Sequence, residues 1–142
     1  MSDIIRDITE ISRCGAQYRA DNLSSLGLKG CHASYLSEIC ACPGISQDKL
    51  AQRICINKSN VARQAAILEE EGFITRQPSQ ADKRVLELYP TDKTRALMPR
   101  IQTVLSDWET CLTGDLTEEE VSQISGILER MKKKASAWME AH

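Results

Sequence analysis

The chain has 142 residues, of which 42% are hydrophobic and 27% are charged, values typical of a globular domain with a real core. No apolar run approaches the ~20 residues of a membrane span, and the N-terminus lacks the basic and apolar segments of a signal peptide. We therefore expect a cytoplasmic protein that has no membrane partner. The net charge of −2 does not exclude a nucleic-acid binder, because such binding depends on where the charges lie.

Apolar residues near both ends of the chain alternate at spacings of three and four, which predicts helices with narrow apolar seams. One seam lies within residues 4–18, a second within residues 97–111 and a third within residues 121–138. Pro99 lies inside the second helix and should kink or restart it, because proline lacks a backbone donor and clashes with the preceding turn. Thr117, followed by Glu120, predicts a capping box at the start of the third helix.

The terminal helices have too little chain around them to bury these seams. The simplest solution is burial against a second copy, so we predict a homodimer joined by an intertwined helical layer. The alternative is packing of the three helices within one chain. The residues assigned to the dimer interface are Ile4, Ile8, Ile11, Trp108, Val121, Ile124, Leu128, Met131 and Trp138.

The chain divides into three parts by composition, within a single structural domain. Residues 1–27 predict an N-terminal dimerisation helix, residues 28–90 a compact module, and residues 91–142 the C-terminal dimerisation helices. The acidic residues gather at positions 69–71 and 118–120. Residues 57–63 contain two basic residues and no acid, which gives part of the module a positive surface.

The compact module begins with helices joined by a tight turn. A helix is expected over residues 30–42. Ser46 is a natural N-cap for the next helix, over residues 47–54, and Asn57 is a natural N-cap for a third. That third helix covers residues 58–71.

A charged hairpin follows these helices. Gly72 ends the third helix, and residues 73–75 and 85–89 predict strands on either side of a polar tip. Helix, turn, helix and hairpin together indicate a winged helix-turn-helix. The predicted fold is thus mainly α with a small β-wing (α+β), and the terminal helices form a dimerisation layer.

The helix over residues 58–71 has a face suited to DNA. On a helical wheel Val61 and Leu68 point inward, whereas Ser59 and Arg63 lie on the opposite side. Small and polar residues on an outward face fit a major groove, which admits one helix. Arg63 can reach a guanine edge or a phosphate, and the flanking amides of Asn60 and Gln64 can pair with adenine or bridge through water. The residues assigned to DNA by this helix and the preceding one are Ser46, Gln47, Lys58, Ser59, Asn60, Ala62, Arg63 and Gln64.

The hairpin tip supplies a second predicted contact. Lys83 and Arg84 are placed to reach a minor groove or flanking phosphates. Phosphate would repel Asp82 if it pointed outward, so we expect Asp82 to hold Arg84 through a charge-assisted bond. Arg76, at the base of the wing, fits either a phosphate contact or a salt bridge.

Several short motifs together resemble the MarR (multiple antibiotic resistance regulator) family of transcription factors over nearly the whole chain. They are residues 43–51, 56–63, 68–76, 82–84 and 91–93. The resemblance implies a bacterial winged helix-turn-helix homodimer that binds palindromic operators in double-stranded DNA. Such a protein usually represses transcription and is released by a small-molecule effector or by cysteine oxidation. Cys55 stands in the turn where many family members have glycine.

The signal that this regulator would sense has two candidate forms. The resemblance implies a small organic effector in the cleft between the DNA-binding module and the dimer helices. Some family members instead sense peroxides through a cysteine on the first helix, where Cys14 lies one turn before Tyr18. A thiol switch needs access and a stabilised thiolate. Otherwise the cysteines are small buried hydrophobic side chains, reduced in the absence of a signal peptide.

Other classes of function have weaker support. Cys31-His32 and the pair Cys40 and Cys42 suggest a metal, but the pair lies about 200° apart on a helix. We expect no metal and no cofactor. An enzyme would need a nucleophile with a base or a metal, and no thiol has a persuasive histidine partner, so we expect no catalysis. The main rival is a winged helix that binds another protein.

Overall fold

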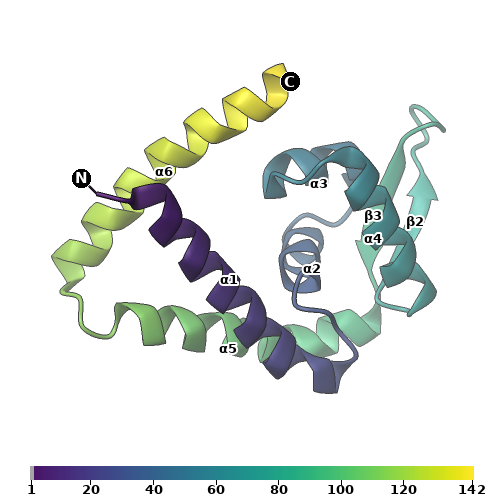
Figure 1. Ribbon diagram of the computed structural model, residues 1–142. Coiled ribbons are helices and arrows are strands. Elements are labelled where there is room, and N and C mark those ends of the chain that lie inside the picture. The colour runs from purple at the N-terminus through teal and green to yellow at the C-terminus, as the bar shows by residue number, and fades with distance from the viewer. Residues whose placement is uncertain (1) are drawn as a thin grey trace.

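The computed structural model describes residues 2–142 as a helical protein with a small sheet (Figure 1). The predicted fold class, mainly α with a β-wing, is confirmed. The elements in chain order are α1 (Ile4–Leu23), the 3-10 helix η1 (Ser24–Leu26), α2 (His32–Ala41), β1 (Ile45–Ser46), α3 (Gln47–Ile54), α4 (Lys58–Glu70), β2 (Ile74–Pro78), β3 (Leu86–Pro90), α5 (Asp92–Thr113) and α6 (Glu118–Ala141).

The sheet is antiparallel and its strands lie in the order β1-β3-β2. Leu88 at the centre of β3 pairs with Ile45 on one side and Arg76 on the other. The sequence did not predict β1, which is only two residues long and forms by pairing with a distant strand. The first wing strand begins one residue later than expected and runs to Pro78.

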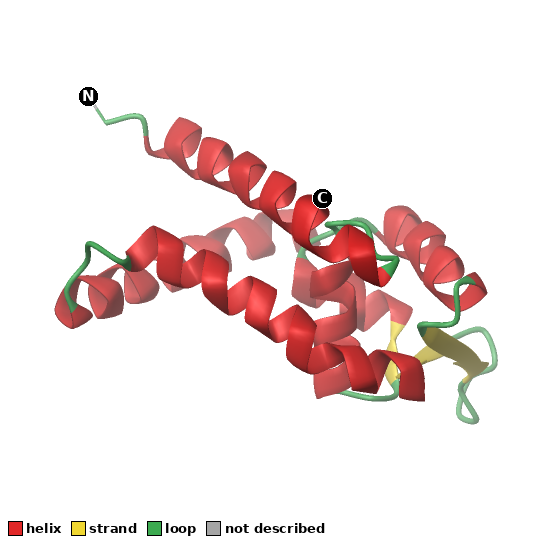
Figure 2. Ribbon diagram, turned by 90° about the horizontal axis from the view of Figure 1, so that it is seen from below, coloured by secondary structure: helices red, strands yellow, loops and turns green. Residues whose placement is uncertain are grey.

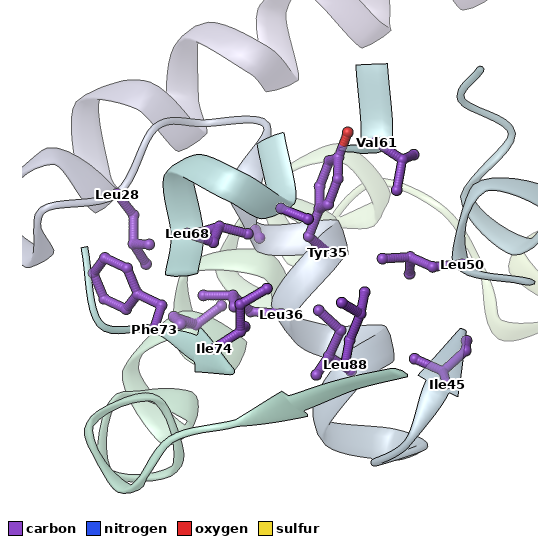
Figure 3. Packing of buried hydrophobic residues seen from close by; sticks show 14 of the residues in the cluster. Leu28, Tyr35, Leu36, Ile45, Leu50, Val61, Leu68, Phe73, Ile74 and Leu88 are labelled. Carbon is purple, nitrogen blue, oxygen red and sulfur yellow. The ribbon is translucent and has the colours of Figure 1, made fainter. Parts of the chain in front are cut away.

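The core lies between α2, α3, α4 and the sheet, as Figure 3 shows. Leu36 of α2, Leu68 of α4 and Leu88 of β3 are fully buried in it. Val61 and Ala65 are buried beside Leu68, so the inward face predicted for α4 is confirmed. Burying this face fixes the opposite face of α4 toward the outside.

Local caps start three of the helices where the sequence predicted. Oγ of Ser46 accepts from the backbone N–H of Lys49 at 3.0 Å and starts α3. Oδ1 of Asn57 accepts from the backbone N–H of Asn60 at 2.8 Å and starts α4. The predicted capping box of α6 is present at Thr117. Each cap satisfies an otherwise unpaired donor and contributes about 1 kcal/mol.

The turn between α3 and α4 is formed by a residue in an unusual conformation. Cys55 has φ 57°, in the left-handed region. A side chain there is disfavoured by about 1–2 kcal/mol relative to the right-handed region. Its backbone N–H closes α3 by donating to the carbonyl of Ala51. Glycine adopts this conformation without that penalty, so the cysteine here is less favourable than a glycine would be in its place.

The helix α5 runs without a break through Pro99, so of the two expected effects the restart does not occur and the kink stays a prediction. Pro99 is exposed, and water can therefore satisfy the carbonyl that the missing N–H leaves free. The carbonyl left free is that of Arg95; a separate bond joins the hydroxyl of Thr103 to the carbonyl of Pro99 at 2.9 Å.

The terminal helices extend away from the core (Figures 1 and 2). Helix α1 packs on α5, whereas none of the 24 residues of α6 is buried. The C-terminal end of α6 returns to α3, where Nε2 of Gln52 donates to Oε1 of Glu140 at 2.6 Å.

Candidate nucleic-acid interface

Helix α4 presents a polar face opposite its buried one. Ser59 and Arg63 are exposed on this face, with Ala62 half-buried beside them. Nη2 of Arg63 donates to Oδ1 of Asn60 at 3.3 Å. Because this bond is exposed, the guanidinium can exchange Asn60 for a base edge or a phosphate at little cost. The arrangement predicted for these side chains is what the structure shows.

The N-terminal end of α4 carries positive potential. Lys58 is exposed, and its Nζ lies 3.5 Å from Oδ2 of Asp48 in an ion pair with both side chains in solvent. Such a pair is weak. Ser59 donates its hydroxyl to Oδ1 of Asn57 at 2.9 Å. The free N–H groups of the first helical turn add a partial positive charge there.

The wing tip is organised by one carboxylate. Asp82 accepts from Nε of Arg84 at 3.1 Å, from its Nη2 at 3.2 Å and from its backbone N–H at 3.0 Å. The bond predicted between these side chains is therefore confirmed. The side-chain bond from Arg84, followed by the backbone bond, lowers the pKa of Asp82. Asp82 is thus ionised at neutral pH and steadies an Arg84 side chain that is 91% exposed. Lys83 is exposed beside it.

Arg76 at the base of the wing forms a salt bridge, which is one of its two predicted roles; the phosphate contact stays a prediction. Its Nε and Nη2 donate to Oε1 of Glu69 at 3.2 and 3.1 Å. Its Nη1 donates to Oε1 of Gln47 at 3.1 Å. The side chain is 22% exposed. Arg76 and Gln47 therefore hold α3, α4 and the wing in one orientation, and Ser46 serves as a cap.

The amide of Gln64 also has an internal partner. Its Oε1 lies 2.9 Å from Nε2 of His32, a residue of α2. A bidentate contact with adenine needs both ends of an amide. The pairing of Gln64 with adenine therefore stays a prediction, and it would require the contact between Gln64 and His32 to open. In the sequence His32 stands out only beside Cys31, as part of a possible metal motif, and no pattern links it to Gln64, which lies 32 residues further along the chain.

The cysteines differ in environment. Cys14 is exposed on α1. Tyr18, one turn later, stacks on Trp108 of α5 with the ring centroids 5.0 Å apart. Burial raises the pKa of the Cys40 thiol, which makes that thiol less reactive. Within residues 2–142, no group of three or more His, Cys, Asp or Glu side chains is arranged to hold a metal ion.

Comparison with known proteins identifies the family. A model described as "MarR family" matches residues 32–86. An HTH-type transcriptional regulator of Bacillus subtilis (strain 168), YybA, itself described as uncharacterized, is 34% identical over 134 residues, which cover 94% of this chain and 89% of the relative. This chain belongs to the MarR family of transcriptional regulators. It is a regulator and not an enzyme.

Solved structures of MarR-family proteins have the same fold. The transcriptional regulator SlyA is 32% identical to this chain with a TM-score of 0.93, and the match covers 98% of each chain. A MarR-family regulator from Listeria monocytogenes, solved in complex with 26mer DNA, is 27% identical with a TM-score of 0.93. That match covers 98% of this chain and 93% of the other.

Most of the residues assigned to the dimer interface of this MarR-family chain are exposed. Ile4, Ile8 and Ile11 of α1 are exposed, as are Ile124, Leu128 and Trp138 of α6. Trp108, Val121 and Met131 are half-buried. The exposed residues do not pack within one chain as the intramolecular alternative required. A contiguous apolar surface of this kind usually marks an interaction site.

A cavity of about 420 Å³ lies where α1, α2 and α5 meet. Arg19 of α1 and Leu105 of α5 line it together with Ser34 and Ser37 of α2. The hydroxyl of Ser37 is buried and has no hydrogen-bond partner within the described residues. The volume of the cavity lies within the range of small-molecule sites.

Within the described residues 2–142, every helix is too short or too polar to span a bilayer.

Proposed function

We propose that this chain binds duplex DNA as a homodimer and represses transcription from a palindromic operator. One observation carries the proposal: the exposed face of α4 presents Arg63 and Ser59, while its opposite face is locked into the core. A helix presented in this way can enter a major groove, and Arg84 on the wing extends the contact to the adjacent backbone. The related Listeria monocytogenes regulator was solved with DNA, which supports the same mode here.

The charge distribution supports this mode despite the net charge of −2. Lys58, Arg63, Lys83 and Arg84 are exposed on α4 and the wing. Acidic Glu69, also on α4, is occupied by Arg76. The exposed basic side chains outnumber their acidic neighbours Asp48 and Asp82. The DNA-facing surface is therefore locally basic, which attracts phosphates over about one Debye length of ~8 Å at physiological salt.

The exposed seams of α1 and α6 support the homodimer. Pairing two copies through these helices would cover apolar surface and place two α4 helices on one duplex. Half-sites one helical turn apart, about 34–36 Å, then form a palindrome. The two-fold symmetry of the protein matches the symmetry of the operator.

The test is DNA binding of the wild-type chain as a function of salt. We expect the logarithm of the association constant to fall linearly with the logarithm of the salt concentration, because each phosphate contact releases counterions. Fluorescence anisotropy with duplexes selected from random DNA measures this slope, and the selected sequences give the half-site. A protein-interaction module, the rival function, would show no selected duplex and a flat salt response.

We propose further that a small molecule releases the operator by filling the cavity between α1, α2 and α5. The unpaired hydroxyl of Ser37 and the guanidinium of Arg19 suit a small polar or anionic ligand, since the nearby carboxylate of Glu38 is paired with Arg53. Oxidation of the exposed Cys14 is the alternative signal. It would act on the same dimer layer, one turn from the Tyr18–Trp108 stack.

One release experiment separates these signals. We expect small aromatic carboxylates to dissociate a preformed operator complex of both the wild type and Cys14→Ser. Cys14 does not line the cavity, so its replacement changes neither the entry of the ligand nor the charge of the cavity wall. Ser34→Trp, which narrows the cavity from an exposed position, should blunt this response. Peroxide release of the wild type that is lost in Cys14→Ser would instead establish the thiol mechanism.

A further inference from the structure

His32 lies at the start of α2 with 0% of its surface exposed, and both nitrogens of its ring have a partner. Nδ1 is 3.3 Å from the backbone nitrogen of Lys29. Nε2 is 2.9 Å from Oε1 of Gln64 on α4. The ring of Tyr35 packs edge-on against the imidazole with the ring centroids 6.4 Å apart. The imidazole therefore joins α2 directly to the helix that we propose enters the groove.

The chemistry of these contacts fixes the position of each proton. A backbone N–H can only donate, so Nδ1 of His32 accepts from Lys29. A neutral imidazole whose Nδ1 accepts carries its proton on Nε2, so Nε2 donates. The atom of Gln64 that faces Nε2 must therefore be the carbonyl oxygen. Turning the amide by 180° would set two donors against each other and leave a buried N–H unpaired, which is unfavourable.

We propose that His32 is a positioning residue that orients Gln64, so that the N–H groups of the amide and not its oxygen are presented to DNA. This inference rests on the proposed function of α4. The carbonyl oxygen of Gln64 is held against α2, and its Nε2 has no acceptor within the described residues. The amide can then offer its N–H groups to a base edge or a phosphate, while its oxygen is held toward His32. Asn60 differs, because its bond to Arg63 is exposed and can rearrange on binding.

The consequence is a preference among base edges. Guanine presents N7 and O6 as acceptors in the major groove, and thymine presents O4. Adenine presents an acceptor beside a donor, and a glutamine matches it only when both ends of its amide are free. A Gln64 whose oxygen is bonded to His32 should therefore favour guanine or thymine at the position it reaches and discriminate against adenine.

The test compares bound sequences of the wild type, His32→Phe, Gln64→Met and the double variant. Phe keeps the ring beside Tyr35 but frees the amide of Gln64. We expect His32→Phe to reduce discrimination against adenine at one position of each half-site by about fivefold or more, with the salt slope unchanged. Gln64→Met should lose the preference at that same position. Adding His32→Phe to Gln64→Met should have no further effect, since the two residues act as a unit.

A spectroscopic measurement keeps the inference testable if His32→Phe does not fold. Nitrogen-15 NMR of the wild-type imidazole should show a protonated Nε2 and an accepting Nδ1, and Gln64→Met should still change the preference at one base position. A proton on Nδ1 would overturn the inference. So would a folded His32→Phe with wild-type base preference, while DNA binding itself would stand. Absence of any DNA binding by the wild type would refute the proposed function instead.

Discussion

Leu128→Glu on α6 should convert the protein to a monomer and lower its affinity for a palindromic operator by about 10²–10⁴-fold. Leu128 is 41% exposed in one chain, so a glutamate there leaves the fold of the monomer unaffected. In the proposed dimer the partner subunit would cover this carboxylate and leave it without a counter-ion, which is strongly unfavourable. The affinity falls because linking two DNA-binding modules gives the second contact a high effective concentration, and a monomer lacks that gain.

Sedimentation velocity and operator binding measure the two parts of this prediction on the same sample. Ser122→Glu is the matched control, because Ser122 lies on α6 away from the seam and is exposed. The control should remain a dimer with wild-type affinity. A Leu128→Glu protein that remains dimeric would show that α6 does not form the interface. A wild type that is monomeric at micromolar concentration would refute the homodimer.

The features that sequence predicted well are those with their causes close together in the chain. The caps at Ser46, Asn57 and Thr117 each bond a backbone N–H three residues away. The bond between Asp82 and Arg84 spans two residues. Such contacts depend on local geometry, so residue types and spacing are enough to predict them.

The features that sequence missed depend on tertiary packing. The strand β1 exists because β3 pairs with it from 43 residues further along the chain, as Ile45 opposite Leu88 shows. The bond between His32 and Gln64 joins different helices. Arg76 had two equal roles in the sequence, and only the fold brings Glu69 to its guanidinium. Composition and periodicity carry no information on such pairs, because many side chains could meet across the core.

This division affects the proposed DNA contacts. The helical wheel placed Gln64 correctly on the flank of the helix. A wheel describes one helix in isolation, however, so it could not show that the oxygen of Gln64 contacts His32 of α2. Conversely, Arg63 has no partner outside α4 in the described residues, so local reasoning was sufficient for it. Sequence therefore predicts best which side chains are free to contact a ligand when those side chains lie on the solvent side of a helix.

Arg63→Ala should weaken operator binding by about 1–3 kcal/mol, or ~5–150-fold, for each half-site contact that it loses. Arg63 is exposed and bonded only to Asn60, so its removal should leave the melting temperature within about 1–2 °C of the wild type. If it contacts a guanine edge, the preference at that base relaxes. If it contacts a phosphate, affinity falls for every sequence and the salt slope decreases by about one per contact.

Anisotropy titrations of wild type, Arg63→Ala and Arg84→Ala over a range of salt and operator variants distinguish these outcomes. Arg84 lies on the wing, held by Asp82, and its removal should lower the salt slope without changing preference in the major groove. Arg130→Ala, on an exposed position of α6, is the charge-matched control and should bind like the wild type. All three substitutions remove one positive charge, so a difference in operator affinity between them reports the position of the arginine and not the net charge of the protein. Equal affinity of Arg63→Ala and wild type would show that α4 does not enter the groove by this face.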